Sequence, residues 1–199
     1  MDNSRRLIIR WLAGISISLI SLVTGTEARA QDDITIRWDL ISLDFSTNPV
    51  TAREGGIASA RAQDGSKITL TGQGTFDSFD PTDDVTGGGK WTTFDPRGER
   101  TGSGDYQVVG LVSFIGAPGR TGVIDTIGDR ADSRAGLAIL RISYSDGSRG
   151  TLTVSCHLQG TPASVFEGIT ASKSFIDYWS READVPGVDA NRTIFHVVP

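Results

Sequence analysis

Cysteine and histidine are scarce in this chain of 199 residues. The single cysteine is Cys156, and the two histidines are His157 and His196. One thiol cannot form a disulfide within the chain, so we expect packing alone to stabilise the fold. Zinc sites built on cysteine pairs are excluded, and two histidines are too few for a multi-histidine site. We therefore expect no cofactor, and a bound metal would have to use carboxylate and carbonyl oxygens.

The common catalytic and phosphate-binding motifs are also absent. No serine stands in a G-x-S-x-G pattern. The run Gly87-Gly88-Gly89-Lys90 lacks the first glycine and the final Ser/Thr of a phosphate-binding loop, and a three-glycine turn explains it better. The sequence therefore offers no motif that defines a reaction.

An extended apolar stretch occurs at the N-terminus, from Trp11 to Val23. It is preceded by basic residues, Arg5, Arg6 and Arg10, and followed by the small-residue pattern Ala28-Arg29-Ala30. This order is typical of a cleavable secretory signal peptide. A membrane span needs roughly 20 mostly apolar residues, more than this stretch supplies. We expect residues 1–30 to be a signal peptide and no stable membrane span to remain after its cleavage.

The route of export has two interpretations. The segment from Ser4 to Arg10 resembles a twin-arginine signal, with a serine, two arginines, apolar residues and a further base. An ordinary basic region with paired arginines fits equally well. The twin-arginine pattern favours a bacterial source and a domain that folds before export. Either route predicts a periplasmic or secreted protein.

The remaining 169 residues carry an acidic surplus. Without the four bases and two acids of residues 1–30, the chain has 15 bases and 22 acids, a net charge of −7. This length suits one domain. Nucleic acids and anionic membranes prefer basic patches, so the charge argues against both as partners. We expect residues 31–199 to form a single domain.

Two-residue alternation of apolar and polar side chains dominates this domain, and helical periodicity is nearly absent. The clearest unit is a hairpin of residues 137–144 and 151–158 with Asp146-Gly147 in its turn. Turn signals separate about eight to ten short strands. The sequence therefore predicts an all-β fold, either a single antiparallel β-barrel or a β-sandwich.

Three local patterns carry more specific predictions. The alternation changes phase at Leu40-Ile41, which predicts a β-bulge. Residues 106–115 are apolar in both phases, as in a strand covered on both sides. Gly72 and Gly74 occupy apolar positions, which predicts a bend or a close approach of another segment.

Cys156 and His157 are adjacent, but neighbouring side chains of a strand point to opposite faces. Cys156 shares the phase of Leu152 and Val154, so we expect a buried, unreactive thiol. His157 lies on the polar face, which would line a pocket in a barrel with a polar interior and would face solvent in a sandwich. If the protein is an enzyme, the candidate catalytic residues are His157 with Glu167 or Asp177. Glu167 and Asp177 would form a glycosidase pair only at a defined separation, which the sequence does not give.

Aromatic residues are the candidates for ligand binding. Trp91, Tyr178 and Trp179 could act as stacking platforms for a glycan or small molecule, with Asp177 beside them. Large aromatics are usually buried, so core packing is the favoured interpretation.

An acidic loop is the candidate metal site. Calcium would be held by four aspartates, Asp77, Asp80, Asp83 and Asp84. Their spacing does not match an EF-hand, so a solvated turn is favoured.

These observations favour an exported, non-catalytic binding or envelope-associated β-domain whose ligand is a small molecule or glycan. The alternative is a small exported β-barrel enzyme of the isomerase, cyclase or lyase type. A structural or interaction protein without a small-molecule site also stays open.

Overall fold

Strands account for nearly all the regular structure in the computed structural model, which describes residues 34–77, 85–183 and 191–198. These ranges contain 14 strands, one short 3-10 helix, η1 (Arg130–Asp132), and no α-helix. No helix in the described ranges is long and apolar enough to cross a membrane. The all-β prediction is confirmed. The predicted signal peptide lies outside the described residues.

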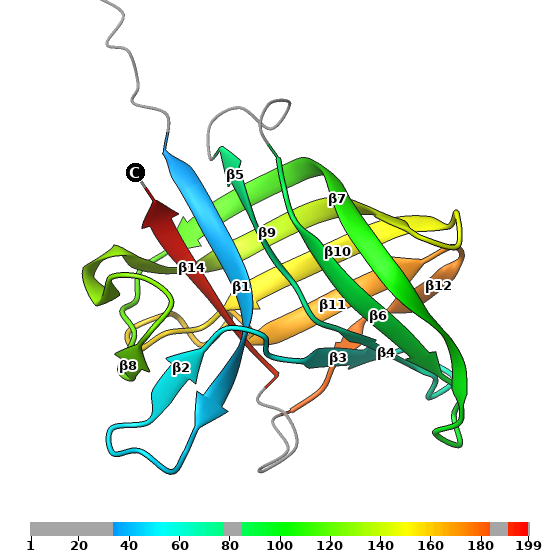
Figure 1. Cartoon of the computed structure of the whole chain (residues 1–199), viewed down its shortest axis with the longest axis horizontal. Coiled ribbons are helices and arrows are strands. Elements are labelled where there is room, and N and C mark those ends of the chain that lie inside the picture. Colours follow the sequence, from blue (N-terminus) through cyan, green and yellow to red (C-terminus); the bar gives the residue numbers. More distant parts are fainter. Residues whose placement is uncertain (1–33, 78–84, 184–190, 199) are drawn as a thin grey trace, which may run out of the picture. The chain divides into compact units, whose positions relative to one another are not determined.

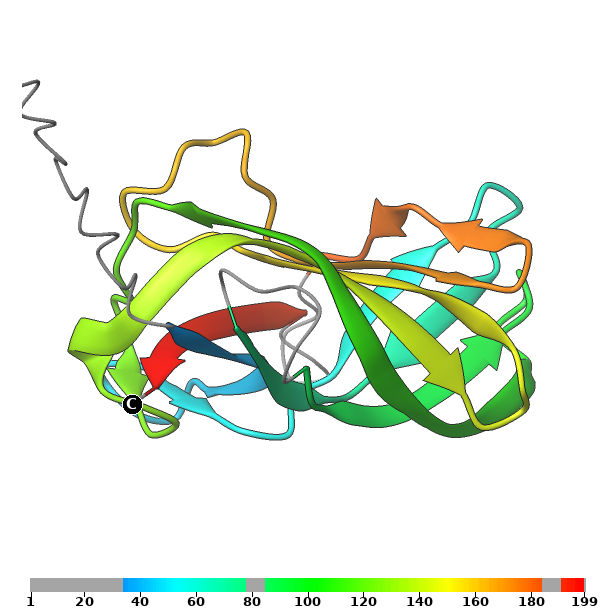
Figure 2. The ribbon, with the colours of Figure 1, turned by 90° about the horizontal axis from the view of Figure 1, so that it is seen from above.

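Six strands close into an antiparallel barrel, which decides between the two predicted architectures (Figure 1). Their order around the barrel is β9 (Ser133–Tyr144), β14 (Arg192–Val198), β1 (Thr35–Asp44), β5 (Gln73–Asp77), β6 (Gly88–Phe94) and β7 (Arg100–Ala117). The ring closes because β7 pairs with β6 through its first half and with β9 through its second half. Figure 2 shows β7 crossing from one side of the barrel to the other.

Further strands extend the sheet on both sides of the barrel. Beyond β9 lie β10 (Arg149–Cys156), β11 (Gly168–Lys173) and β12 (Ile176–Tyr178), and beyond β6 lie β4 (Lys67–Leu70), β3 (Ala58–Arg61) and β13 (Ser180–Arg181). The strands β9 and β10 form the predicted hairpin. Next to β1, the short strands β2 (Thr51–Arg53) and β8 (Ile124–Asp125) pair in parallel (Figure 1).

The interior of the sheet is filled by one large apolar cluster, here called the main core. Its largest fully buried side chains are Trp38, Phe76, Phe195, Leu40, Ile68, Leu70, Leu140, Ile142, Leu152 and Ile169. Cys156 belongs to the same cluster and is fully buried, as predicted from its phase. Burial raises the pKa of its thiol well above the ordinary value, so the thiol stays protonated.

The prediction that β7 is covered on both faces is wrong. Val109, Val112 and Ile115 are each at least half exposed. The register of β7 against β9 shifts twice, between Val108 and Gly110 and between Leu111 and Ser113. Each irregularity changes the alternation, so Val108 and Leu111 both face the main core although they are three positions apart. The apolar run therefore comes from irregular strand pairing, which changes the positions that face the main core. Only one face of β7 is covered.

The bulge predicted at Leu40-Ile41 is absent, because β1 pairs with β14 in unbroken register from Thr35 to Ile41. The two side chains instead point to opposite faces. Leu40 enters the main core, and Ile41 joins a second cluster with Ala52 and Ile194 on the outer face of β1 and β14. The apolar positions of β1 change phase because the outer face of the strand is also covered at this end.

The two glycines before and within β5 are places of close approach, as predicted. A Cβ atom at Gly72 would lie 2.1 Å from the hydroxyl oxygen of Tyr106, and one at Gly74 would lie 2.3 Å from the carbonyl oxygen of Thr86. Only glycine fits at these contacts without a shift of neighbouring atoms.

Candidate functional site

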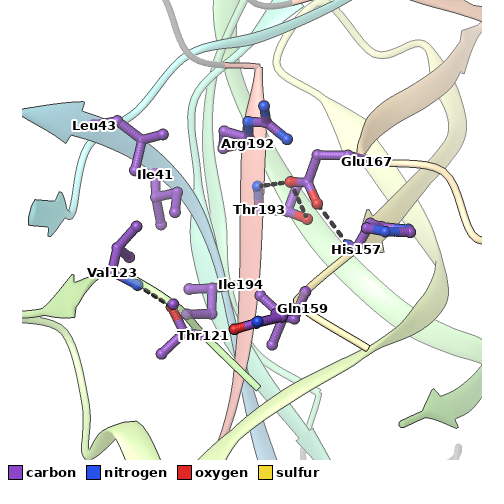
Figure 3. A pocket seen from close by; sticks show the side chains of 12 residues that line it. Ile41, Leu43, Thr121, Val123, His157, Gln159, Glu167, Arg192, Thr193 and Ile194 are labelled. Atoms are coloured by element: carbon purple, nitrogen blue, oxygen red, sulfur yellow. Dashed lines mark hydrogen bonds between the residues drawn. The ribbon is translucent and has the colours of Figure 1, made fainter. Parts of the chain in front are cut away.

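A cavity of about 230 Å³ lies on the outer side of β14, next to the second cluster (Figure 3). Its lining residues are Ile41, Leu43, Thr121, Gly122, Val123, His157, Leu158, Gln159, Glu167, Arg192, Thr193 and Ile194. They come from the end of β1, the start of β14, the chain just after β10, the residue before β11 and the segment before β8. Drug-sized ligands occupy roughly 300–1,000 Å³, so this cavity suits a smaller molecule.

Glu167 is the polar centre of the cavity, and its carboxylate is held on both sides. The backbone N–H of His157 donates to Oε2 over 2.5 Å, and the backbone N–H of Thr193 donates to Oε1 over 2.7 Å. The hydroxyl of Thr193 lies 3.4 Å from the same Oε1. The carboxylate therefore joins the end of β10 to the start of β14, and these contacts fix its orientation (Figure 3).

The surroundings of Glu167 favour its neutral form. Burial raises the pKa of Glu167 to about 7, although the hydrogen bonds from His157 and Thr193 and the positive charge of Arg192 act in the opposite direction. Near neutral pH the side chain is therefore present in both protonated and ionised forms. A group in this state can accept or donate a proton.

His157 lies beside Glu167, but through its backbone. Its Nδ1 is 2.8 Å from the carbonyl oxygen of Val165. Because a carbonyl can only accept, Nδ1 carries the hydrogen, and in the neutral ring Nε2 keeps the lone pair. In Figure 3 the imidazole extends away from the carboxylate. The structure thus brings two of the candidate catalytic residues together without a side-chain hydrogen bond between them.

Asp177, the third candidate, lies elsewhere. It is exposed on β12 and pairs with Ser172 on β11, whereas Glu167 precedes the start of β11. Five residues of extended strand span roughly 16 Å. The carboxylates of glycosidases are at most about 9.5 Å apart, so the geometry does not favour Glu167 and Asp177 as such a pair.

The three candidate aromatics occupy different environments. Trp91 and Tyr178 are buried in the main core. The Nε1 of Trp91 donates to the carbonyl of Asp105 over 3.1 Å, and its ring faces the Lys173 ammonium 4.3 Å away. Trp179 is 56% exposed, so of these three it alone presents its ring to solvent.

The candidate calcium loop is described only at its beginning. Asp77 is the last residue of β5, and Asp80, Asp83 and Asp84 lie outside the described residues. Within the described part of the chain, no three metal-ligating side chains of histidine, cysteine, aspartate or glutamate are grouped.

The sequence reasoning missed one buried pair near the cavity. The Nε2 of His196 lies 2.8 Å from Oδ2 of Asp125, and both side chains are 1% exposed. Asp125 Oδ1 also accepts the N–H of Ile127 over 3.0 Å. The pair attaches the segment of β8 to the outer face of β14, and the residues just before β8 form a wall of the cavity. No local signal in the sequence joins residues 71 positions apart.

Arg192, Gln159 and Thr121 also line the cavity and were not singled out from the sequence. They stand in strand ends and loops, where polar residues are ordinary. The cavity lining therefore combines a carboxyl group with a pKa of about 7, a guanidinium, an amide and a hydroxyl with several apolar side chains. Comparison with models of protein families, with curated proteins and with solved structures found no match to this chain.

Proposed function

We propose that the chain is an exported binding protein that holds a small, largely apolar molecule in the Glu167 cavity. The observation that carries this proposal is the fixed carboxylate of Glu167 in a cavity with apolar walls. Small-molecule sites typically combine an apolar lining with a few oriented polar groups. Export rests on the basic, apolar and A-x-A order of residues 1–30.

The charges of the cavity favour a neutral ligand. Glu167 and Arg192 carry opposite charges on the same wall, and the charge of Arg192 already lowers the pKa of Glu167. A charged ligand would leave an excess charge in a poorly hydrated site. A molecule with an apolar body and one hydroxyl or carbonyl group would match both the wall and the carboxylate.

The main core supports binding outside the barrel rather than within it. The barrel interior is filled by apolar side chains, so the cavity lies beside β14. The enzyme hypothesis with a His157–Glu167 side-chain pair has less support, because the imidazole is bonded to Val165. A glycan would instead stack on Trp179, which is exposed.

Thermal unfolding with two ligand panels tests this proposal. One panel holds small neutral alcohols, ketones and phenols, and the other holds mono- and oligosaccharides. We expect members of the first panel to raise the Tm of the wild-type protein and of Trp179→Ala. They should not raise the Tm of Val123→Phe, in which a larger side chain occupies the cavity.

Two results would contradict the proposal. The first is stabilisation that persists in Val123→Phe. The second is stabilisation by sugars alone that disappears in Trp179→Ala, which would move the binding site to the exposed indole. The unliganded Tm of each variant shows whether it is folded.

A further inference from the structure

We infer that Glu167 is a general base that removes a proton from a carbon acid held in the cavity. This inference rests on the proposed function, because the molecule must first bind beside the carboxylate. It goes beyond that function by assigning a chemical step and a class of substrate. The class is a small neutral molecule with a C–H bond acidified by a neighbouring carbonyl or a comparable group.

The first argument is the orientation of the carboxylate. Two backbone N–H groups, those of His157 and Thr193, each bind a different oxygen. A carboxylate has about four lone-pair sites, so each oxygen keeps acceptor capacity beyond these two bonds. Backbone donors do not swing away as side chains do. The base is therefore preorganised, which lowers the cost of aligning it with a C–H bond.

The second argument is the environment of the base. The apolar part of the cavity lining is made by Ile41, Leu43, Val123, Leu158 and Ile194. A carboxylate with little hydration is a stronger base than one in water. The pKa of about 7 for Glu167 has the same cause, since burial is its largest contribution. A base with a pKa near the working pH combines a usable ionised fraction with a useful driving force.

The third argument is the supply of groups that stabilise the product. Removal of the proton leaves an electron pair that becomes the double bond of an enolate, with negative charge on the former carbonyl oxygen. Arg192, Gln159 and Thr121 line the same cavity and carry a positive charge or hydrogen-bond donors. Return of the proton from Glu167 to a different carbon completes an isomerisation. The step needs no oxidant, reductant or second substrate.

Titratable groups near Glu167 could produce a similar pH dependence. The groups next to Glu167 are Cys156, His157 and Arg192. The thiol of Cys156 is buried in the main core with a raised pKa, and the guanidinium of Arg192 has only hydrogen-bond donors. His157 is therefore the group that a test must separate from Glu167.

The test uses 5-nitrobenzisoxazole, a flat neutral carbon acid, as a probe with the mature protein. A base takes the ring C–H proton, the electron pair forms the nitrile, and the N–O bond breaks to give a coloured nitrophenolate. We expect turnover by the wild-type protein and by Trp179→Ala, with kcat/KM rising with pH through about 7. In Glu167→Gln we expect a loss of about a hundredfold or more.

Two further variants separate the base from its neighbours. His157→Ala keeps the backbone N–H that binds Glu167 but removes the imidazole. The pH inflection should persist in this variant, and its disappearance would overturn the assignment to Glu167. Glu167→Asp keeps the charge but withdraws the carboxylate by one methylene, and we expect an intermediate rate. This variant replaces Glu167→Gln if the amide prevents folding.

Binding is measured separately with nitrobenzotriazole, an isostere that lacks the reactive C–H. Suppose that nitrobenzotriazole raises the Tm of the wild-type protein. If the wild-type protein then shows no turnover, or if turnover survives in folded Glu167→Gln, the inference is overturned and the proposed function stands. If nitrobenzotriazole neither raises the Tm nor competes with turnover, the inference is overturned, and the result also counts against the proposed function. Binding together with Glu167-dependent turnover supports both.

Discussion

The two faces of β1 and β14 are built in different ways. Their inner face, in the main core, is apolar and carries Trp38, Leu40 and Phe195. Their outer face is covered by β2, β8 and the adjoining segments and buries polar side chains. These are Asp39, which lies 2.8 Å from the half-buried Arg37, and the pair of Asp125 and His196 at 2.8 Å. Asp39 and His196 are as deeply buried as the side chains of the main core.

The difference explains where a cavity can form. Apolar contacts have no preferred direction, so side chains of the main core pack from all sides. The segments that cover the outer face are held by a few directional contacts, such as the pair of Asp125 and His196. Contacts of this kind leave space between them. The cavity lies in this space, beside the small second cluster. The main core and the cavity therefore lie on opposite faces of the same strands.

Truncation of a main-core aromatic should have the largest effect on stability. Phe195 is fully buried and contacts the rings of Phe114 and Phe76, with centroids 5.3 and 6.4 Å away. We expect Phe195→Ala to lower the free energy of unfolding by about 3–5 kcal/mol, because it leaves a cavity. Denaturant unfolding measures this. Phe175→Ala is the control, since Phe175 is 95% exposed. If both variants lost the same free energy of unfolding, the main core would not be the source of stability.

Breaking the buried pair of the outer face should come next. We expect Asp125→Ala to cost about 3 kcal/mol, because it leaves the Nε2 of His196 buried without its acceptor. The control is Asp105→Ala, which breaks the exposed pair with Lys90 and should cost less than about 1 kcal/mol. If the two substitutions cost the same, the outer face does not depend on its buried pair.

The effect of Asp125 should also depend on pH. Burial raises its pKa, but the hydrogen bonds from His196 and Ile127 outweigh burial, and the net pKa is lowered. A lowered pKa stabilises the folded state above the ordinary value of 3.8, and this contribution is lost as the pH falls through the folded-state pKa. The difference between wild type and Asp125→Ala should therefore narrow in acid. A constant difference would contradict this.

Glu167 should show an effect of opposite sign. Its folded-state pKa of about 7 exceeds the ordinary 4.5, so its contribution is present below 4.5 and is lost as the pH rises through about 7. Relative to Glu167→Gln, the wild-type protein should lose up to about 3 kcal/mol between acidic and alkaline conditions. Unfolding at several pH values measures this slope. Parallel curves for the two proteins would contradict it.

The smallest effect is expected at Trp179. Its ring is 56% exposed, so Trp179→Ala should change the free energy of unfolding by no more than about 1 kcal/mol. Trp91→Ala is the matched comparison, because that ring is buried and should cost about 3–5 kcal/mol. A large loss at Trp179 would show that it packs as a structural residue.

The sequence predicted the fold class because alternation is a local property of a strand. The hairpin of β9 and β10, the burial of Cys156 and the tight contacts of Gly72 and Gly74 followed from phase and residue type. The predictions failed where the burial of a side chain depended on which other segments cover the strand. The phase change at Leu40-Ile41 predicts a bulge that is absent, and the apolar run of β7 predicts burial on both faces where the strand has bulges instead.

The candidate site was predicted only in part. Glu167 and His157 were singled out as a pair, and they do lie together, but the contact uses the backbone of His157. Trp91, Tyr178 and Trp179 could not be sorted in advance, because a large aromatic fits both a core and a surface. Their burial depends on segments that the local pattern does not contain.

By itself, the sequence determined a disulfide-free chain of alternating strands, since one cysteine and a two-residue period are properties of the sequence. The tertiary structure decided that the strands close into a barrel and that the carboxylate of Glu167 meets Thr193, which is 26 positions away. It also decided that Asp125 meets His196 and that both side chains are buried. Contacts of this kind depend on the register and curvature of the whole sheet, which no single segment encodes.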